Sequence, residues 1–550
     1  MTRFAHRLHR RRLGQLRPVV FAGRRRGAPA PKAIDLRGRG REPFTRMLRC
    51  GPVLVVRNDA ARTAFSASLD PRPRLRLRID ILLPLILLVL SLVQNLEQVD
   101  VSPFHRDEAR WIGRAHFLRE VFDPFSPNWN DFYLTSTQPP FGSYMMGLGL
   151  FLQGRDLTTN SIWDFNFGQE WNETTGAMPE AGDLNAGRRM NAVLGALVTL
   201  TVYFIGKQLG NRVGATIGAA FIALHPLHIL LSSQALSDVT LALLLALLFL
   251  MSMRLARHPS WANAIIVAVL LGLGGSAKLA PLLLSIPLAT LGGALLVRSF
   301  MTRFTDAPRK DRDLGIKLLL QPIMAFIVFV ASYPYLWVDP IRRSYKMFAF
   351  RADEMQGQGT IWPDLAVGSP LVALARIGAR LGETSTTSGH VTGSFLNLIG
   401  LQGHTIPAGL DFLPAVAGMV LLFEMVIRYG LRSRQALISL LLVSEVGAIA
   451  FGMKADFNRY HLPIVLIMSI CIAVSASAAW SLLAKFNAWS VFNLVPGIRV
   501  TNRAANAPST IPNTNPEVLD KKQARPQNPG RRFVAQRSEQ RQPTSSSGMD

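Results

Sequence analysis

Ten long apolar runs divide this 550-residue chain. They measure roughly 15–22 residues, and about 20 helical residues cross the hydrocarbon core of a bilayer. Only 17% of the residues are charged and 49% are hydrophobic, which excludes an ordinary soluble domain. The fold class expected is therefore an all-α polytopic membrane protein. The predicted spans are Ile79–Leu96, Met190–Leu209, Val213–Leu231, Val239–Leu255, Trp261–Gly275, Leu279–Val297, Ile316–Trp337, Phe412–Ile427, Ala436–Met453 and Leu462–Leu483.

The basic residues orient these spans. With the N-terminus in the cytoplasm, every short basic loop falls on the same side, as the positive-inside rule expects. The loops 97–189 and 338–411 then lie outside, and the first of them carries 13 acids against 7 Lys and Arg. We predict a basic, disordered cytoplasmic tail over 1–78, a transmembrane domain over 79–485 and a second disordered basic tail over 486–550. We expect the plasma (inner) membrane as the location, with the active site on the extracytoplasmic face.

The net charge of +25 is concentrated in the tails. Residues 1–78 hold 21 Lys and Arg against 4 acids. We interpret these tails as cytoplasmic flanks that attract anionic headgroups, and we expect no nucleic-acid partner because no nucleic-acid fold signature accompanies them. The two cysteines are far apart in sequence, so they predict neither a disulfide framework nor a zinc site. No Walker motif or dinucleotide fingerprint appears, which argues against ATP-driven transport.

An acidic pair, Asp107–Glu108, follows the first span within the sequence His-Arg-Asp-Glu-Ala-Arg-Trp. Carboxylates so close to lipid are costly unless they are solvated or functional. They read either as a solvated pair on an interfacial helix or as a general base for a lipid-borne substrate. A Gln138-Pro139-Pro140 segment follows, leading the 12-residue apolar stretch Phe141–Leu152, which is too short to span and is predicted to lie at the interface.

The order of these motifs resembles the polyprenyl-phosphate-sugar-dependent membrane glycosyltransferases of the GT-C superfamily, in the branch of the protein O-mannosyltransferases and aminoarabinose transferases. The similarity continues through Arg188–Leu197, Gly206–Gly210 and the His225-Pro226 segment that leads to Asp238. It covers most of residues 79–300. A polar insert over 154–186 departs from the family pattern, and its role is left open between acceptor choice and an idle loop.

The resemblance implies roles for several residues. Asp107 would be the general base, with Glu108 and Asp238 as further catalytic acids; Asp238 reads equally well as a helix N-terminus. Lys278 would hold the phosphate of the lipid carrier, although a snorkelling lysine is the alternative. Arg459 is a second candidate phosphate clamp, against a plain loop arginine.

Tyr144 and His390 are candidate contacts to the acceptor or the sugar, although loop histidines are more commonly solvated. No cofactor is predicted with certainty, and a divalent metal is left open.

The resemblance implies transfer of a mannose-like or aminosugar unit from a polyprenyl or dolichyl phosphate to an acceptor hydroxyl of a protein, lipid or glycan. The alternative functions are a transporter or flippase without covalent chemistry, and a structural membrane protein whose loops bind partners. A transporter predicts charged residues along a path inside the spans, whereas the acids and cations singled out here gather at outer span ends.

Overall fold

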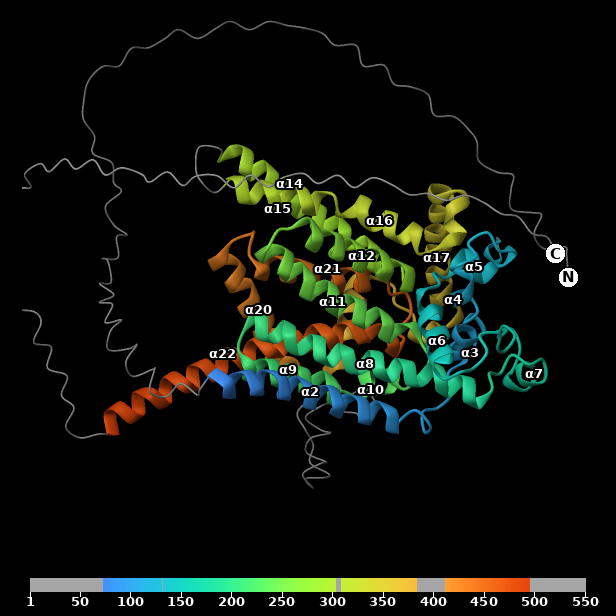
Figure 1. The fold of residues 1–550 in the computed structure, drawn as a ribbon, viewed down its shortest axis with the longest axis horizontal. Helices are drawn as coiled ribbons and strands as arrows, with labels where there is room; N and C mark the ends of the chain where they lie inside the picture. Colours follow the sequence, from blue (N-terminus) through green and yellow to red (C-terminus); the bar gives the residue numbers. More distant parts are fainter. Residues whose placement is uncertain (1–72, 131, 303–307, 383–410, 495–550) are drawn as a thin grey trace, which may run out of the picture. The chain divides into compact units, whose positions relative to one another are not determined.

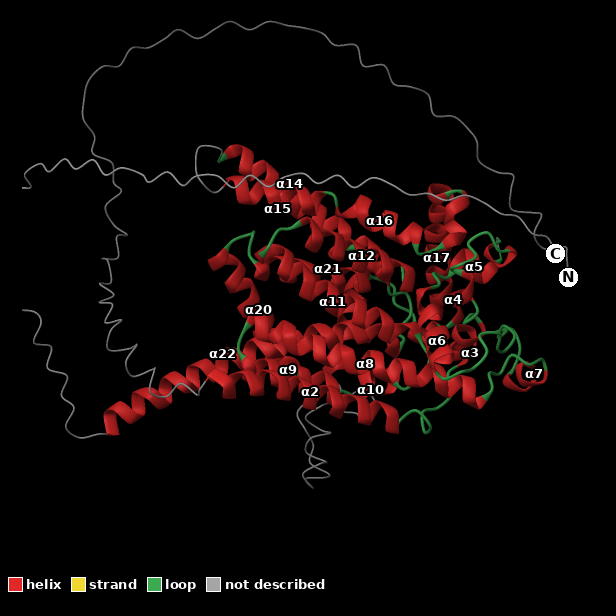
Figure 2. Ribbon diagram, viewed as in Figure 1, coloured by secondary structure: helices red, strands yellow, loops and turns green. Residues whose placement is uncertain are grey.

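The computed structural model describes residues 73–130, 132–302, 308–382 and 411–494. The chain divides into two compact units, Met1–Pro73 and Arg74–Asp550, and the described residues from Arg74 on belong to the second. Within the described residues the secondary structure is helical, and an isolated β-bridge between Ala366 and Ala455 is the one extended pairing (Figure 2). The expected all-α membrane architecture is confirmed.

Long helices follow the predicted spans (Figure 1). They are α2 (Pro73–Glu97), α8 (Ala181–Leu209), α9 (Arg212–Leu224), α10 (Pro226–Ser232), α11 (Ser237–Arg257), α12 (Trp261–Ala277), α13 (Ala280–Leu283), α14 (Ser285–Met301), α15 (Pro308–Leu319), α16 (Gln321–Ala331), α20 (Phe412–Tyr429), α21 (Arg434–Gly452) and α22 (Leu462–Leu494). In the described residues, 8 helices are long and apolar enough to cross a membrane, or 9 with the bent pair α9–α10. The 17-residue α12 is a shorter apolar helix, so each predicted run contains a helix.

Several boundaries differ from the prediction; for example, α8 begins at Ala181 instead of Met190, and α22 continues to Leu494 instead of Leu483. The run Val213–Leu231 bends by 60° before Pro226, which lacks a backbone N–H and begins α10. The break predicted between Gly275 and Leu279 is present, although α12 continues two residues further than expected, to Ala277, with Lys278 as its C-cap residue. The run Ile316–Trp337 divides into α15 and α16 next to Pro322.

Ion pairs join the basic loops at one end of the spans, which we call the inner end. Asp80 near the start of α2 pairs with Lys207 at 2.9 Å and with Arg212 at 2.6 Å. Asp311 of α15 pairs with Arg298 at 3.5 Å and with Arg432 at 3.4 Å. These contacts bring together loops that the charge pattern had assigned to one side of the membrane.

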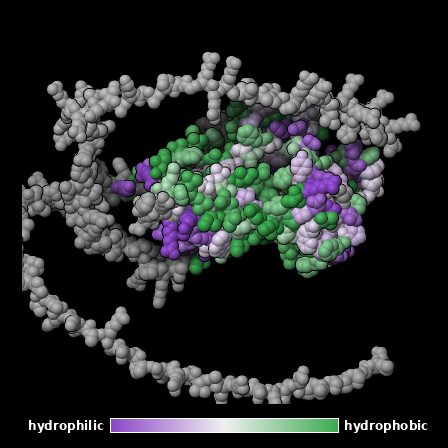
Figure 3. Space-filling view, turned by 90° about the horizontal axis from the view of Figure 1, so that it is seen from above, coloured by the Kyte–Doolittle hydropathy of each residue, from purple (hydrophilic) through white to green (hydrophobic). Residues whose placement is uncertain are grey.

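A second group of helices lies at the opposite, outer end of the spans (Figure 1). They are α3 (Arg106–Gly113), α4 (Phe117–Glu120), α5 (Tyr133–Thr137), α6 (Phe141–Leu152), α7 (Gln169–Thr174), α17 (Pro340–Ile361), α18 (Pro370–Gly382) and the 3-10 turns η2 (Pro334–Val338) and η4 (Asn458–His461). In the view of Figure 3, hydrophobic residues gather across the middle and hydrophilic residues at both ends. This is the surface of a multi-pass membrane protein, in which large apolar side chains such as Leu82, 56% exposed, face lipid.

Candidate active site

A cavity of about 310 Å³ opens at the outer end of the spans. This volume is within the range of small-molecule sites. Four of the predicted residues line it, although they come from four separate segments of the chain: Asp107, Asp238, Lys278 and Arg459. Two predicted acids and two predicted cations thus converge on one cavity, whose lining also includes Arg110, Arg351, Glu354 and Glu445.

The short helix α3 carries Asp107 into this cavity. His105 precedes the helix, and its Nδ1 accepts a hydrogen bond from the Asp107 backbone N–H at 3.1 Å. Burial alone would raise the pKa of the Asp107 carboxyl. The nearby charge of Arg459, followed by those of His105 and Arg110, outweighs burial and holds this pKa below its ordinary value of 3.8. Asp107 is therefore ionised, and its pairing with Arg459 weakens it as a base as long as the pair lasts.

Arg459 reaches Asp107 from the turn η4, just before the last span. Its Nη1 forms an ion pair with Oδ2 of Asp107, and the two side chains are 23% and 19% exposed. The loop before η4 is anchored by Asp456, which accepts from Arg380 at 3.1 Å and contacts His461 at 2.7 Å. Two distant parts of the chain, 352 residues apart, therefore meet at this pair.

Asp238 and Lys278 form the second pair. Lys278 Nζ donates to Asp238 Oδ1 at 2.5 Å, and the Asp238 side chain is 5% exposed. Leu236 occupies the N-cap of α11 and no side chain caps that helix, so Asp238 does not serve as the cap. Lys278 is the C-cap residue of α12, where the negative end of the helix dipole favours a cation.

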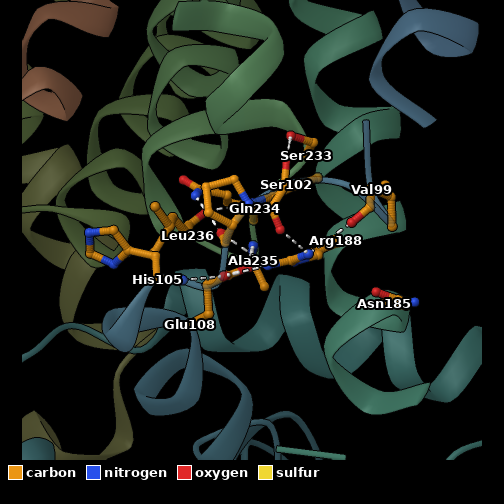
Figure 4. A network of polar contacts seen from close by, with 12 residues as sticks. Val99, Ser102, His105, Glu108, Asn185, Arg188, Ser233, Gln234, Ala235 and Leu236 are labelled. Atoms are coloured by element: carbon orange, nitrogen blue, oxygen red, sulfur yellow. Dashed lines mark hydrogen bonds and ion pairs between the residues drawn. The ribbon is translucent and has the colours of Figure 1, made fainter. Parts of the chain in front are cut away.

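Glu108 points away from the cavity although it is the neighbour of Asp107. It is fully buried and forms a two-pronged ion pair with Arg188 of α8, with both N–O distances at 2.8 Å (Figure 4). Its carboxylate also accepts from the backbone N–H of His105 at 2.8 Å and of Ala235 at 2.7 Å. Since Ala235 lies in the turn that leads to Asp238, Glu108 fixes the positions of both cavity acids.

The insert 154–186 packs on α3. Asn160 Nδ2 donates to the Ala109 carbonyl at 3.0 Å, and Thr159 Oγ1 donates to the Ile112 carbonyl at 3.1 Å. Ile112 lies in the last turn of α3, where the helical hydrogen-bond pattern stops, and Ala109 lies one turn earlier. The insert therefore caps the helix that carries Asp107. Its Phe165 ring also lies 4.0 Å from the Arg110 guanidinium, which lines the cavity.

Sequence reasoning missed several lining residues. Arg351, Glu354 and Gln358 come from α17, in a stretch where no motif singled them out. Glu445 lies within the span α21 and is 1% exposed, so it is an exception to the expectation that acids gather at the outer span ends. A lone acid inside an apolar run was the signal available for it.

Two predicted residues lie elsewhere. Tyr144 of α6 is 5% exposed, its hydroxyl donates to the Ser332 carbonyl at 3.1 Å, and it is not a lining residue of the cavity. His390 falls outside the described residues.

The described residues fit a resident divalent metal poorly. No group of three or more His, Cys, Asp and Glu side chains gathers in the part of the chain that the structure describes. Three of the four acids that line the cavity, Asp107, Asp238 and Glu354, are paired with cations, whereas Mg²⁺ or Ca²⁺ takes six or more oxygen ligands.

One protein-family model matches part of this sequence. Residues 118–336 match the dolichyl-phosphate-mannose-protein mannosyltransferase family. The matched segment includes α6, Asp238 and Lys278, and the resemblance predicted from the sequence is confirmed over it. No curated protein matches this sequence.

Solved structures with similar helix arrangements share little sequence. The Archaeoglobus fulgidus oligosaccharyltransferase tethered with an acceptor peptide is 14% identical, with a TM-score of 0.42 over 75% of this chain and 51% of that chain. The same archaeal enzyme complexed with an inhibitory peptide and dolichol-phosphate has a TM-score of 0.41 at 14% identity, over 74% and 52%. ArnT from Cupriavidus metallidurans bound to undecaprenyl phosphate is 15% identical, with a TM-score of 0.40 over 74% and 63%. The present chain thus spans about half the length of the oligosaccharyltransferase.

Proposed function

We propose that this protein is a membrane glycosyltransferase that moves a sugar from a polyprenyl or dolichyl phosphate to an acceptor hydroxyl. The observation that carries the proposal is the meeting of two acids and two cations in one cavity at the outer end of the spans. A lipid phosphate needs cations and a place beside the bilayer, and the reaction needs a base. The matched family, named for dolichyl-phosphate-mannose, supports the same chemistry.

Lys278 and Arg459 are the proposed phosphate ligands. Both line the cavity, and both lie at outer ends of helices next to apolar walls that suit a prenyl chain. Arginine's planar fork matches phosphate oxygens, and lysine supplies a compact charge. When the sugar leaves, negative charge develops on the phosphate oxygen, and the two cations stabilise that charge in the transition state.

Asp107 is the proposed general base. The acceptor oxygen attacks the anomeric carbon, the bond from that carbon to the phosphate oxygen breaks, and the hydroxyl proton passes to Asp107. Attack opposite the leaving phosphate inverts the anomeric configuration. A phosphate that engages Arg459 weakens the Arg459–Asp107 pair, which returns basicity to the Asp107 carboxylate when the donor is bound.

Glu108 and Asp238 have supporting roles in this proposal. Glu108 is a positioning residue, because its four hydrogen bonds join α3 to α8 and to the turn before α11. Asp238 orients the Lys278 ammonium through their 2.5 Å contact. No step is routed through a metal.

We infer an active site on the extracytoplasmic face of the plasma membrane. The inner-end loops hold the paired basic residues Lys207, Arg212, Arg298 and Arg432, and the positive-inside rule assigns that end to the cytoplasm. The cavity lies at the opposite end. The family name favours mannose over an aminosugar as the transferred unit, and a protein, a lipid or a glycan remains open as the acceptor.

The test combines a deletion strain with a reconstituted assay. Membranes from the deletion strain supply the acceptor, purified protein is added in vesicles, and transfer from labelled polyprenyl-phosphate-mannose is measured, with mass analysis of the glycans in parallel. Asp107→Asn should lower transfer at least about 100-fold, because a general base contributes roughly 10²–10⁴-fold. Asp313→Asn is the matched control. Asp313 lies on α15, pairs with Lys317 and has a 49% exposed side chain. Full transfer by Asp107→Asn would refute the mechanism.

A further inference from the structure

The proposed mechanism leaves two lining acids unused: Glu354, which pairs with Arg351, and Glu445. Glu445 belongs to α21, seven residues before the helix ends at Gly452, so it lies about 10 Å along the axis from the outer end. The side chain is 1% exposed and lines the cavity, and its Oε2 has no hydrogen-bond partner among the described residues.

The surroundings of Glu445 are apolar. Neighbouring lining residues include Leu241, Ala448 and Ile449, and no ion pair to Glu445 is found in the described part of the chain. A buried carboxyl without a partner costs several kcal/mol at membrane depth. Helix packing does not explain such a cost, since an apolar residue would fill the same place. A ligand that offers a polar partner would offset it.

The chemistry of the proposed donor limits which of its groups can be the hydrogen-bond partner of Glu445. A prenyl chain offers only C–H groups, and the phosphate carries negative charge that suits Lys278 and Arg459 rather than an acid. The acceptor hydroxyl is assigned to Asp107. Sugar hydroxyls are the remaining polar groups of a lipid-phosphate sugar, and a carboxyl side chain can both donate to and accept from them when protonated.

We propose that Glu445 is a specificity-determining residue that hydrogen-bonds a hydroxyl of the transferred sugar. This inference rests on the proposed function and deepens it, because it names the cavity wall that recognises the sugar. A site built around a polar partner discriminates strongly against an analogue that lacks the matching hydroxyl, since its own polar group is then left unpaired.

The experiment uses the reconstituted full-length protein, with polyprenyl-phosphate-mannose and its monodeoxy analogues lacking the hydroxyl at position 2, 3, 4 or 6. The wild type should disfavour one analogue by about tenfold or more in kcat/KM. Glu445→Leu should lower kcat/KM for the parent donor by a similar factor and reduce discrimination at that position to below about twofold, because the interacting pair is already broken. Glu445→Gln, which keeps hydrogen-bonding capacity, should retain most of the discrimination.

Ser439→Ala is the control. Ser439 lies on the same helix and is 3% exposed, and its hydroxyl has no hydrogen-bond partner among the described residues, yet it does not line the cavity. An unchanged analogue profile in Glu445→Leu, or a loss in Glu445→Gln as large as in Glu445→Leu, would overturn this inference while leaving the proposed function intact. Absence of transfer by the wild type with any lipid-linked sugar would remove the proposed function, and this inference with it.

Discussion

Two adjacent acids lie on different faces of α3, and they differ in exposure and in the number of their hydrogen-bond partners. On the cavity face, Asp107 has a 19% exposed side chain and one ion-pair partner, Arg459. On the buried face, the fully buried Glu108 receives four hydrogen bonds, two of them from Arg188 (Figure 4). Consecutive helical residues point about 100° apart, so neighbours in sequence face different surroundings.

The difference separates a group that can exchange partners from one that cannot. The four hydrogen bonds of Glu108 occupy both carboxylate oxygens, and Arg188 in turn donates to the carbonyls of Val99 and Ser102 at 2.8 and 3.0 Å. Any exchange would leave a buried charge unpaired. Asp107 can release Arg459 to a ligand phosphate, because both groups are partly exposed to the cavity. A rigid support on one face thus holds an adaptable site on the other.

The largest effect is expected on the buried face. Arg188→Met leaves the Glu108 carboxylate buried without its cation, so the free energy of unfolding should fall by about 3–5 kcal/mol. Thermal unfolding of the detergent-solubilised protein measures this loss. The double variant Glu108→Leu with Arg188→Met should recover much of it, because no charge stays buried. A single variant as stable as the wild type would show that the pair does not support α3.

A smaller effect is expected on the cavity face, where Arg459→Gln should change the pH dependence of kcat/KM. The pKa of Asp107 lies below 3.8 in the free protein, where Arg459 is its partner. The base is ionised above its pKa, so kcat/KM should stay flat at neutral pH and fall only in acid below that value. In Arg459→Gln the main lowering charge is gone while burial, which raises this pKa, remains. The acid limb of kcat/KM should therefore move to higher pH.

The wild type provides an internal comparison for this shift. If the donor phosphate engages Arg459, the acid limb of kcat, which reports the donor complex, should lie at higher pH than that of kcat/KM. Arg351→Gln is a suitable control, since this arginine also lines the cavity but pairs with Glu354. The exchange of partners would be contradicted if the acid limbs of kcat and kcat/KM coincided in the wild type and if Arg459→Gln left them at the same pH.

Several features of the fold and site were predictable because they depend on local sequence. Apolar runs of bilayer length gave the spans, and the basic loops placed Asp107, Asp238, Lys278 and Arg459 at one end of them. Residues at the same end of a helical bundle lie close together in space. The structure brings these four to one cavity.

Other features depend on packing between distant segments. Nothing near Glu108 in sequence indicates that Arg188, 80 residues away, would saturate its carboxylate. The sequence leaves the role of the insert 154–186 open between acceptor choice and an idle loop, because its contacts to α3 use single polar side chains such as Asn160 without a motif. Glu445 did carry a signal, as a lone acid in a span, but its direction toward the cavity follows from the rotation of α21 against its neighbours.

The smallest effect is expected from the insert, which supports α3 from its C-terminal end. Asn160→Ala removes the donor to the Ala109 carbonyl at 3.0 Å and to the Ala177 carbonyl at 2.9 Å. Neutral hydrogen bonds contribute about 0.5–1.5 kcal/mol each, so α3 should loosen without unfolding. Transfer should fall a few-fold in kcat while the KM for the donor stays unchanged, because Asp107 shifts and the phosphate ligands do not. Asn185→Ala, which removes an exposed hydrogen bond to Asp100 at 2.9 Å, is the matched control. A donor KM that rises with unchanged kcat would instead mean that the insert acts on donor binding and not on the position of the base.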